Sequence, residues 1–417
     1  MKIMQINDFY YPLGGAEIYF LDICKSLEEL GHEVIVVSSS HQPKTSYRKK
    51  EYFLPSSRGI KSSFKIFKIW NMFKKIIKEN NPDIIHIHNI YYFLSPFLLR
   101  KLFFIKPTVR TIHDVRLFCP CLNGKIIKKK NVICHYPIGI SCIKNGCYPF
   151  NCKGINILNS FYKLFVTFYE LQVTKELDAI IVGSKYMQEE SIRNKIPVEK
   201  ISINPLYVRE EIKGNKDKVQ ENLILYIGKL EEYKGIFALI HALKLLPLNL
   251  KWKAKIIGEG SLFEDIKIEI KKSKMKTKIV LERESSLEKL KRNYQKAFIV
   301  VIPSLIPESF CLVGIEAMSF GIPVVAFDVG GIREWLKHGK NGFLVKRGDI
   351  KGLVYYIRLL LENKTLAQKL GEEGQRIVKE KFSRKKHIEK LINIYENVLN
   401  ARRKKNSHKK YYFYCWR

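Results

Sequence analysis

Ten short apolar runs alternate with longer stretches of helical spacing along this chain of 417 residues. Each run is apolar at successive positions, as strands of a parallel sheet are when helices cover both faces of the sheet. Repeated in two halves of a chain too long for one ordinary core, this alternation predicts an α/β protein with two doubly wound domains. The runs are residues 2–6, 33–39, 83–87, 108–113 and 179–184, followed by 223–228, 253–258, 278–282, 298–304 and 323–327.

A polar segment at 209–222 marks the expected junction of the two domains. Ligands of doubly wound domains bind beyond the carboxyl ends of the strands, so we expect the functional site in an interdomain cleft. The expected parts are an N-terminal domain at 1–207 with a cysteine-rich insertion at about 117–155, a C-terminal domain at 208–382, a helix at 383–401 that packs back on the N-terminal domain, and a basic and aromatic tail at 402–417.

The chain is strongly basic, because 74 Lys and Arg against 40 Asp and Glu give a net charge of +34. Such a field attracts nucleic acid, anionic lipid headgroups or phosphorylated substrates, and the charge alone does not choose among them. The first residues do not resemble a secretory signal, and no uncharged apolar stretch reaches the roughly 18 residues of a spanning helix. We therefore expect a cytoplasmic protein whose cysteines are mostly reduced.

Three glycine-bearing turns follow predicted strands. Glycines at the start of a helix let the backbone approach an anion, and the first N–H groups of that helix point at it. Two lysines on one such turn could neutralise a diphosphate, although turn geometry and ordinary surface charge explain each turn equally well when it is taken alone. The candidate donor-binding residues are Gly14 and Gly15 in the first turn, Gly228, Lys229 and Lys234 in the second, and Gly258 and Glu259 in the third.

Two glutamates mark the segment PESFCLVGIEAMSFGIPVVAFDVGG at 307–331. A helix is predicted from Phe310 to Gly321, with Glu308 at its mouth and Glu316 about two turns deeper, roughly 12 Å along the axis. Carboxylates accept paired hydrogen bonds from the vicinal hydroxyls of a ribose or hexose. Glu308 could instead complement the helix dipole, whereas Glu316 on an apolar helix needs a ligand or a buried donor.

These motifs, in this order, resemble those of glycosyltransferase family 4, the retaining sugar-nucleotide enzymes with the GT-B fold of two facing Rossmann-like domains. The segments that carry the resemblance are GGAE, GKLxxxKG, GEG, PESFxxxxxEAMxxGxPVVAxxxGG and NGFLV at 341–345, and it covers nearly the whole chain up to about residue 400. The chain resembles in particular a subgroup with a cysteine-containing insertion after the His-Asp motif.

The resemblance implies roles for individual residues. Glu316 would bind the ribose of the donor nucleotide, and the backbone amides of Phe310, Cys311 and Leu312 would face the sugar and diphosphate. The implied catalytic residues are His113 and Glu308, both near the donor sugar, and Lys229 and Lys234, which would stabilise the leaving diphosphate with Gly15 approaching from the other domain.

Two positions depart from the family pattern. Lys229 stands where an arginine is usual, and Glu282 where a glycine is usual, so the nucleotide stays open. No Asp-x-Asp metal signature is present, and we expect catalysis to need no cofactor.

The insertion concentrates cysteines. In a reduced compartment such clustering favours a structural zinc ion, although no spacing is a clean Cys-x-x-Cys, and disulfides or thiols stay open. The candidate ligands are Cys119, Cys121, Cys134, Cys142, Cys147 and Cys152.

A basic stretch at 61–80 carries apolar residues at helical spacing: Phe64, Phe67, Trp70, Phe73 and Ile77. We expect this stripe, widened by Ile66, Ile69 and Ile76, to contact an anionic membrane surface. Its alternative is a stripe that packs on the sheet of the domain.

The expected function is that of a hexosyltransferase in surface polysaccharide or glycolipid synthesis. It would move a sugar from a nucleotide-sugar donor to a glycan or lipid-linked acceptor at the inner face of the cell membrane. One alternative is a nucleic-acid-binding protein, which would explain the charge but not Glu316 or the glycine turns, and no specific nucleic-acid partner is expected. Another is a GT-B phosphorylase or epimerase.

Overall fold

The computed structural model divides the chain into two compact units, Met1–Asn204 with Ile388–Arg417 and Pro205–His387. The division lies three residues before the expected 207/208 boundary and ahead of the polar segment. The structure describes residues 1–40, 50–55, 66–90, 95–120, 124–147, 157–214, 222–247, 249–273, 275–283 and 286–414.

The first unit is built on a seven-stranded sheet with the order β3-β2-β1-β4-β5-β8-β9. Every neighbouring pair runs parallel, so the carboxyl ends of the strands meet at one edge, as in a Rossmann-like fold. The strands are β1 (Lys2–Ile6), β2 (Glu33–Ser39), β3 (Glu51–Leu54), β4 (Ile84–Ile87), β5 (Thr108–Ile112), β8 (Ala179–Val182) and β9 (Ile201–Ile203). The five predicted strands of this half are present, and β3 and β9 are additional.

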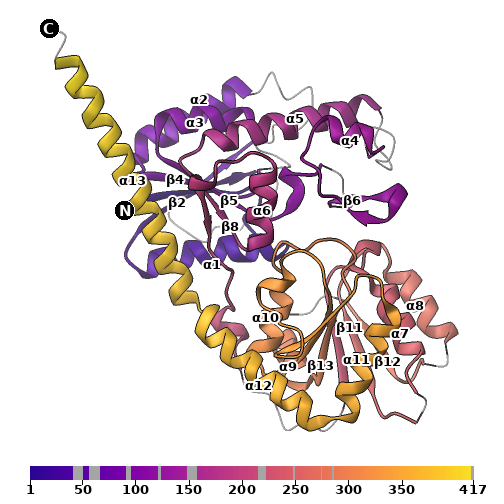
Figure 1. The fold of residues 1–417 in the computed structure, drawn as a ribbon. Helices are drawn as coiled ribbons and strands as arrows, with labels where there is room; N and C mark the ends of the chain where they lie inside the picture. Colours follow the sequence, from indigo (N-terminus) through magenta and orange to yellow (C-terminus); the bar gives the residue numbers. More distant parts are fainter. Residues whose placement is uncertain are drawn as a thin grey trace. The chain divides into compact units, whose positions relative to one another are not determined.

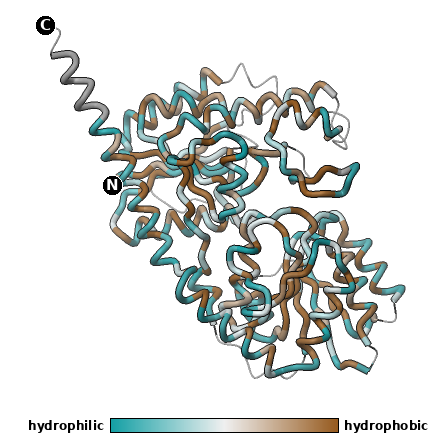
Figure 2. Tube along the Cα trace, viewed as in Figure 1, coloured by the Kyte–Doolittle hydropathy of each residue, from teal (hydrophilic) through white to brown (hydrophobic). Residues whose placement is uncertain are grey.

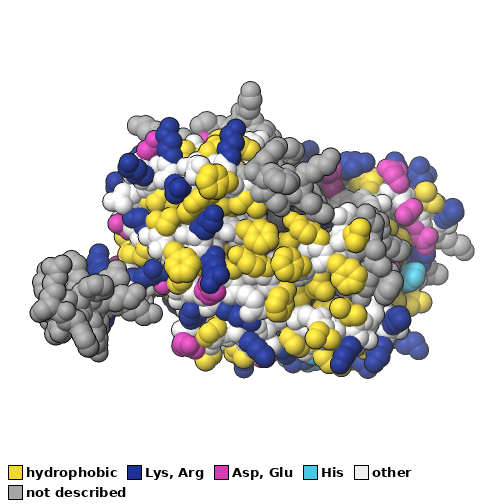
Figure 3. All heavy atoms as spheres, turned by 90° about the horizontal axis from the view of Figure 1, so that it is seen from above, with side chains coloured by type: hydrophobic (Ala, Val, Ile, Leu, Met, Phe, Trp, Pro, Cys, Tyr) yellow, Lys and Arg dark blue, Asp and Glu magenta, His cyan; other side chains and the backbone are white. Residues whose placement is uncertain are grey.

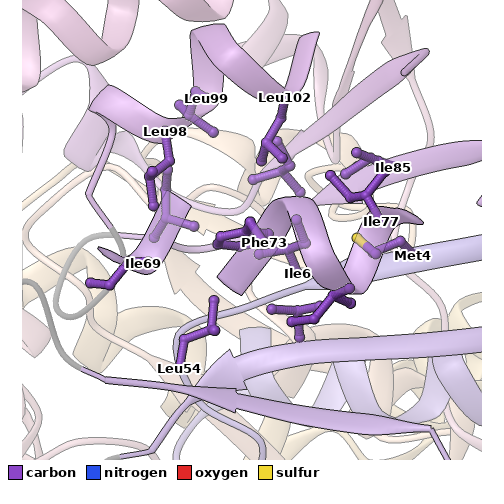
Figure 4. Close-up of a cluster of buried hydrophobic side chains, with 14 of the residues drawn as sticks. Met4, Ile6, Leu54, Ile69, Phe73, Ile77, Ile85, Leu98, Leu99 and Leu102 are labelled. Atoms are coloured by element: carbon purple, nitrogen blue, oxygen red, sulfur yellow. The ribbon is translucent and has the colours of Figure 1, made fainter. Parts of the chain in front are cut away.

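Helices cover both faces of this sheet (Figure 1). They are α1 (Gly15–Glu29), α2 (Ile66–Asn80), α3 (Phe97–Ile105), α4 (Ile140–Lys144), α5 (Ile157–Glu176) and α6 (Lys185–Arg193). One core cluster packs α2 and α3 against the strands, with Phe73 of α2 near Ile6 of β1 (Figure 4). The insertion adds the antiparallel pair β6 (Ile126–Ile127) and β7 (Val132–Ile133).

The apolar stripe of α2 faces this core, which corrects the expectation that the stripe as a whole contacts a membrane. Ile69, Trp70, Phe73, Ile76 and Ile77 are all buried and belong to the core cluster. The alternative, a stripe packed on the sheet, is therefore the right one for these residues. Of the other predicted positions, Phe67 is exposed, Ile66 is partly buried, and Phe64 lies outside the described residues.

The second unit holds a six-stranded sheet with the order β12-β11-β10-β13-β14-β15, again parallel throughout. The strands are β10 (Leu223–Ile227), β11 (Lys253–Ile257), β12 (Ile279–Glu282), β13 (Ile299–Ile302), β14 (Val324–Phe327) and β15 (Gly342–Val345). The helices are α7 (Ile236–Lys244), α8 (Phe263–Lys272), α9 (Leu287–Lys296), α10 (Leu312–Ser319), α11 (Ile350–Glu362) and α12 (Lys364–Lys381). Figure 2 shows hydrophobic residues concentrated along the central strands, and the predicted α/β fold class is confirmed.

The last helix, α13 (Arg384–Tyr414), is longer than the expected 383–401 and takes in most of the expected tail. Its buried residues include Leu391 and Tyr395, and Arg402 forms an ion pair with Asp178 of the first unit, with Nε 2.8 Å from Oδ1. Among the described residues, no helix is long and apolar enough to cross a bilayer.

Candidate active site

The turn after β10 brings one predicted lysine to one predicted glutamate. Lys234 Nζ lies 2.6 Å from Glu308 Oε1, and the Ser304 hydroxyl donates to the same oxygen. Burial lowers the pKa of Lys234, but the Glu308 carboxylate and other neighbouring groups together raise it further, and the net shift is upward. The site therefore holds a fixed cation beside a carboxylate, and Ser304 is a member that the sequence did not single out.

Gly235 permits the close approach of Lys234 to Glu308. It adopts φ +71°, and a Cβ at this position would lie 1.8 Å from the carbonyl oxygen of Pro303. Any other residue would push the lysine-bearing turn away from the end of β13, because the clash is with backbone. The glycine thus fixes the distance between Lys234 and the loop that carries Glu308.

Glu308 lies in a loop before the helix, as predicted, but the helix starts two residues later than the predicted Phe310. Glu308 lies in an extended loop whose backbone pairs with Gly330, and its carbonyl accepts a hydrogen bond from Gly331 N at 2.7 Å. Cys311, at φ +70°, precedes α10, which begins at Leu312 rather than Phe310. Only Glu316 is therefore a helical residue.

The start of α10 presents backbone N–H groups and no nucleophile. The amides of Leu312 and Val313 open the helix and lack intrahelical acceptors, as an anion site requires. The carbonyl of Phe310 accepts a hydrogen bond from Trp335 Nε1 at 2.6 Å, which holds the loop in place. Burial and the nearby Glu308 raise the pKa of the Cys311 thiol to about 12, so this thiol stays protonated.

Glu316 has the buried donor that its apolar surroundings demand. The Tyr294 hydroxyl donates to Glu316 Oε2 at 2.8 Å, and both residues are buried. Burial raises the pKa of the Glu316 carboxyl, while the Tyr294 hydroxyl and Arg209 act in the opposite direction. The structure thus shows an internal partner for one oxygen and a carboxyl that is costly to keep ionised.

The predicted residues Gly228, Lys229, Gly258 and Glu259 lie on adjoining turns of the same unit. Gly228 N donates to the carbonyl of Ile257, and the Glu259 carbonyl accepts from Leu230 N at 2.8 Å, so the turns after β10 and β11 are joined. A Cβ on Gly258 would lie 1.8 Å from the carbonyl oxygen of Gly228. The side chains of Lys229 and Glu259 are exposed.

In the first unit, Gly14 and Gly15 open α1 directly after β1. Glu17, in the first turn, is buried, and burial raises the pKa of its carboxyl, whereas a backbone N–H and the charge of Arg116 act in the opposite direction. This end of the sheet therefore carries a buried carboxyl beside the glycines. Glu17 was not predicted as a site residue.

His113 ends a chain of buried hydrogen bonds that the sequence did not reveal. Its Nε2 lies 2.9 Å from His88 Nδ1, and His88 Nε2 lies 2.8 Å from Gln5 Oε1. Gln5 Nε2 donates to the Tyr395 hydroxyl at 3.2 Å, and this hydroxyl lies 2.6 Å from His86 Nδ1. The histidine after β5 is thereby linked through β4 and β1 to α13.

This series of hydrogen bonds determines which ring nitrogens of His88 and His113 carry a proton. The Gln5 carbonyl can only accept, so His88 carries its proton on Nε2 and accepts at Nδ1 from His113 Nε2–H. That leaves His113 Nδ1 as an acceptor for another group. Burial is the main cause that lowers the pKa of His113 to about 4, so the ring is neutral at neutral pH.

We expect His113 to titrate with a midpoint near pH 4 rather than 6.5. The NMR signals of labelled histidine, assigned with a His113→Asn variant, measure this directly. Because the folded-state pKa is lowered, the stability contribution is complete above about pH 6.5 and is lost as the pH falls towards 4. A midpoint near 6.5 would contradict the expected effect of burial on this ring.

Four of the six insertion cysteines line one small pocket: Cys119, Cys134, Cys142 and Cys147. No disulfide involves these four. Within the described residues, no three His, Cys, Asp or Glu side chains form a group that could hold a metal ion. Cys121 and Cys152 lie outside the described residues, so the structural zinc site stays a prediction.

Comparison with protein families matches both units. The model of glycosyltransferase family 4 matches residues 13–210, and the model of glycosyl transferases group 1 matches residues 208–377. The chain is a glycosyltransferase of family 4. The predicted enzyme class and family are confirmed, whereas the cysteine-insertion subgroup stays a prediction.

Relatives match nearly all or part of this glycosyltransferase. An uncharacterized glycosyltransferase of Methanocaldococcus jannaschii is 24% identical over 95% of this chain and 99% of its own. The capsular polysaccharide biosynthesis glycosyltransferase CapM of Staphylococcus aureus is 25% identical over 55% of this chain and 61% of its own.

Solved structures share the GT-B fold. Sucrose-phosphate synthase from Thermosynechococcus elongatus superposes with a TM-score of 0.73 at 19% identity, covering 96% of this chain and 99% of its own. HepE of Anabaena, in complex with UDP and glucose, gives a TM-score of 0.69 at 17% identity, covering 95% of this chain and 100% of its own.

Proposed function

We propose that this glycosyltransferase moves a hexose from a nucleotide-sugar donor to a glycan or lipid-linked acceptor of surface polysaccharide or glycolipid synthesis, with retention of anomeric configuration. The observation that carries the donor part is the pairing of Lys234 with Glu308 beside the open N-terminus of α10. A fixed cation and helix amides suit a diphosphate, and a carboxylate suits sugar hydroxyls.

In the proposed reaction, the bond between the anomeric carbon and the diphosphate oxygen breaks. The acceptor hydroxyl oxygen bonds to the same face of the anomeric carbon, and its proton passes to the departing diphosphate. Negative charge grows on the leaving group, and Lys234 with the amides of α10 would stabilise it most in the transition state. Lys229 is a further cation for this charge, and His113 is expected to contact the donor sugar.

The acceptor class rests on relatives. CapM is named for capsular polysaccharide biosynthesis, and one structural neighbour is a lipopolysaccharide outer core galactosyltransferase. A GT-B phosphorylase or epimerase would act without such an acceptor, so product analysis with and without an acceptor glycan separates these reactions.

A thermal-shift screen of nucleoside diphosphates and their sugars tests the donor site. We expect one nucleotide to raise the unfolding temperature of the wild type, and Glu316→Gln to bind it about 10–100-fold more weakly, because an amide loses charge-assisted hydrogen bonds to the ribose. Glu362→Gln on α11, exposed beside Arg358, is the matched control and should bind like the wild type. If no nucleotide stabilises the wild type and Glu316→Gln behaves identically, the donor site is wrong.

The ligand-free Glu316→Gln protein provides an internal check on folding. The folded-state pKa of Glu316 is raised, so the carboxyl favours the folded state at low pH, and this contribution is lost as the pH rises through that pKa. The amide cannot ionise and still accepts from Tyr294. We expect the variant to gain stability relative to the wild type between pH 5 and pH 8, measured by urea unfolding.

A further inference from the structure

Helix α5 turns a hydrophobic face outward. Leu158, Phe161, Phe165 and Phe168 are between 44% and 74% exposed. Their spacing of three, four and three residues places them on one side of the helix. A surface helix of a globular protein normally carries charged or polar residues at such positions.

The opposite side of α5 is buried and carries polar residues beside the core residues Leu171 and Val173. Ser160, Thr167, Glu170 and Thr174 are all buried. Arg110 of β5, itself fully buried, forms an ion pair with Glu170 and donates to the Thr174 hydroxyl at 2.6 Å. These contacts fix the rotation of α5, so the outward position of its phenylalanines is built into the core of the unit.

Exposed apolar residues continue onto two neighbouring helices. Phe104 of α3 is 68% exposed, and Phe67 of α2 is 70% exposed. The helices lie side by side, because the rings of Phe97 and Tyr169 join α3 to α5, and Lys101 of α3 lies 5.3 Å from the centre of the Trp70 ring of α2. We call the exposed side of α2, α3 and α5 the outer helical face.

Basic side chains lie among and around the apolar residues of this face. Figure 3 looks onto it and shows hydrophobic side chains gathered over a broad area, with Lys and Arg side chains among and around them. Among the described residues, the exposed acidic side chain of α2 is Glu79 alone. The exposed basic residues of α2 and α3 are Lys68, Lys74, Lys75, Lys78, Arg100 and Lys101.

We propose that the outer helical face docks on a membrane surface that contains anionic lipid. Apolar side chains would enter the boundary between headgroups and acyl chains, and the lysines would meet the headgroup charge. A second copy of the chain fits less well, since a two-fold contact would place the same cations against one another. Lysine is also depleted at protein interfaces, whereas it is enriched beside anionic lipid.

This face differs from the one expected from the sequence. The stripe Trp70, Phe73 and Ile77 of α2 is core, and the apolar surface comes mostly from α5, with Phe67 retained. The proposal does not depend on the identity of the donor. The outer helical face would hold the enzyme on the bilayer surface through α2, α3 and α5.

Vesicle flotation of the full chain tests the proposal. We expect strong binding to vesicles of phosphatidylcholine with one third phosphatidylglycerol and weak binding to phosphatidylcholine alone. The variant Phe161→Ser/Phe165→Ser/Phe168→Ser should partition at least about 10-fold less onto the anionic vesicles. Each of Lys68→Gln and Lys75→Gln should lower partition about 5-fold at low salt, with a smaller effect at high salt.

The matched control removes exposed apolar residues from the second unit, in the variant Ile268→Ser/Val280→Ser/Tyr355→Ser. It should bind vesicles like the wild type, and both triple variants should bind nucleotide unchanged. Equal partition of the phenylalanine variant and the wild type would overturn the proposal. The proposal would also be overturned if the wild type does not bind anionic vesicles but forms a dimer, and the phenylalanine variant does not form this dimer.

Discussion

Lys234→Met should lower kcat for sugar transfer by about 10²–10³-fold, with a smaller effect on nucleotide affinity. The lysine lies 2.6 Å from Glu308, and Gly235, without a Cβ, permits this close approach of the turn. Its charge is needed most when the diphosphate leaves, so the loss should fall mainly on the chemical step. Initial rates with saturating donor, together with nucleotide titrations, separate the two effects.

Lys244→Met on α7 is the control, since it removes an exposed lysine that pairs with Glu269. It should keep full activity. Lys234→Met should remain folded, because Ser304 still donates to Glu308 after the substitution. A variant that is folded and transfers sugar at the wild-type rate would show that Lys234 only complements Glu308 structurally.

Arg110→Met should lower the free energy of unfolding of the first unit by about 3–5 kcal/mol. The substitution leaves the Glu170 carboxylate buried without its guanidinium partner, and α5 loses the contact that fixes its rotation. Urea unfolding followed by circular dichroism measures the loss. Vesicle flotation of the folded fraction should also weaken if the phenylalanines turn away.

The double variant Arg110→Met/Glu170→Leu separates charge from packing. Replacing both partners of a buried pair by apolar residues is often neutral, so we expect most of the lost stability to return. The comparison Arg100→Met removes an exposed arginine whose pair with Glu176 should contribute at most about 1 kcal/mol. A double variant as unstable as Arg110→Met would mean that shape, rather than charge, limits this site.

The strands were the most predictable part of the molecule. Their apolar runs need no knowledge of distant residues, and all ten predicted strands are present, including β1 and β14. The glycine turns and Glu316 could be predicted because backbone approach and a carboxylate among apolar residues are local signals. The start of α10 could not, since it depends on the left-handed backbone at Cys311.

The side-chain hydrogen-bond networks could not be predicted from the sequence, because they depend on how distant segments are aligned in the fold. His86 and His88 are two positions apart, a spacing that places residues on one side of an extended chain, and this was the available signal for a histidine cluster. Their link to Tyr395 requires the position of α13, more than 300 residues later in the sequence. The outward position of the α5 phenylalanines likewise depends on Arg110 from a distant strand. The sequence of α5 alone does not say which side is buried.

The path of α13 decides how the protein can be divided for experiments. The hydroxyl of Tyr395 caps polar groups of β1 and β4, and Leu391 is buried in the same unit. A fragment cut at Asn204 would open Gln5 and His86 to water and lose part of its core. Chimeras with other family members should therefore exchange two segments together, residues 1–204 and the terminal helix from Ile388 onward.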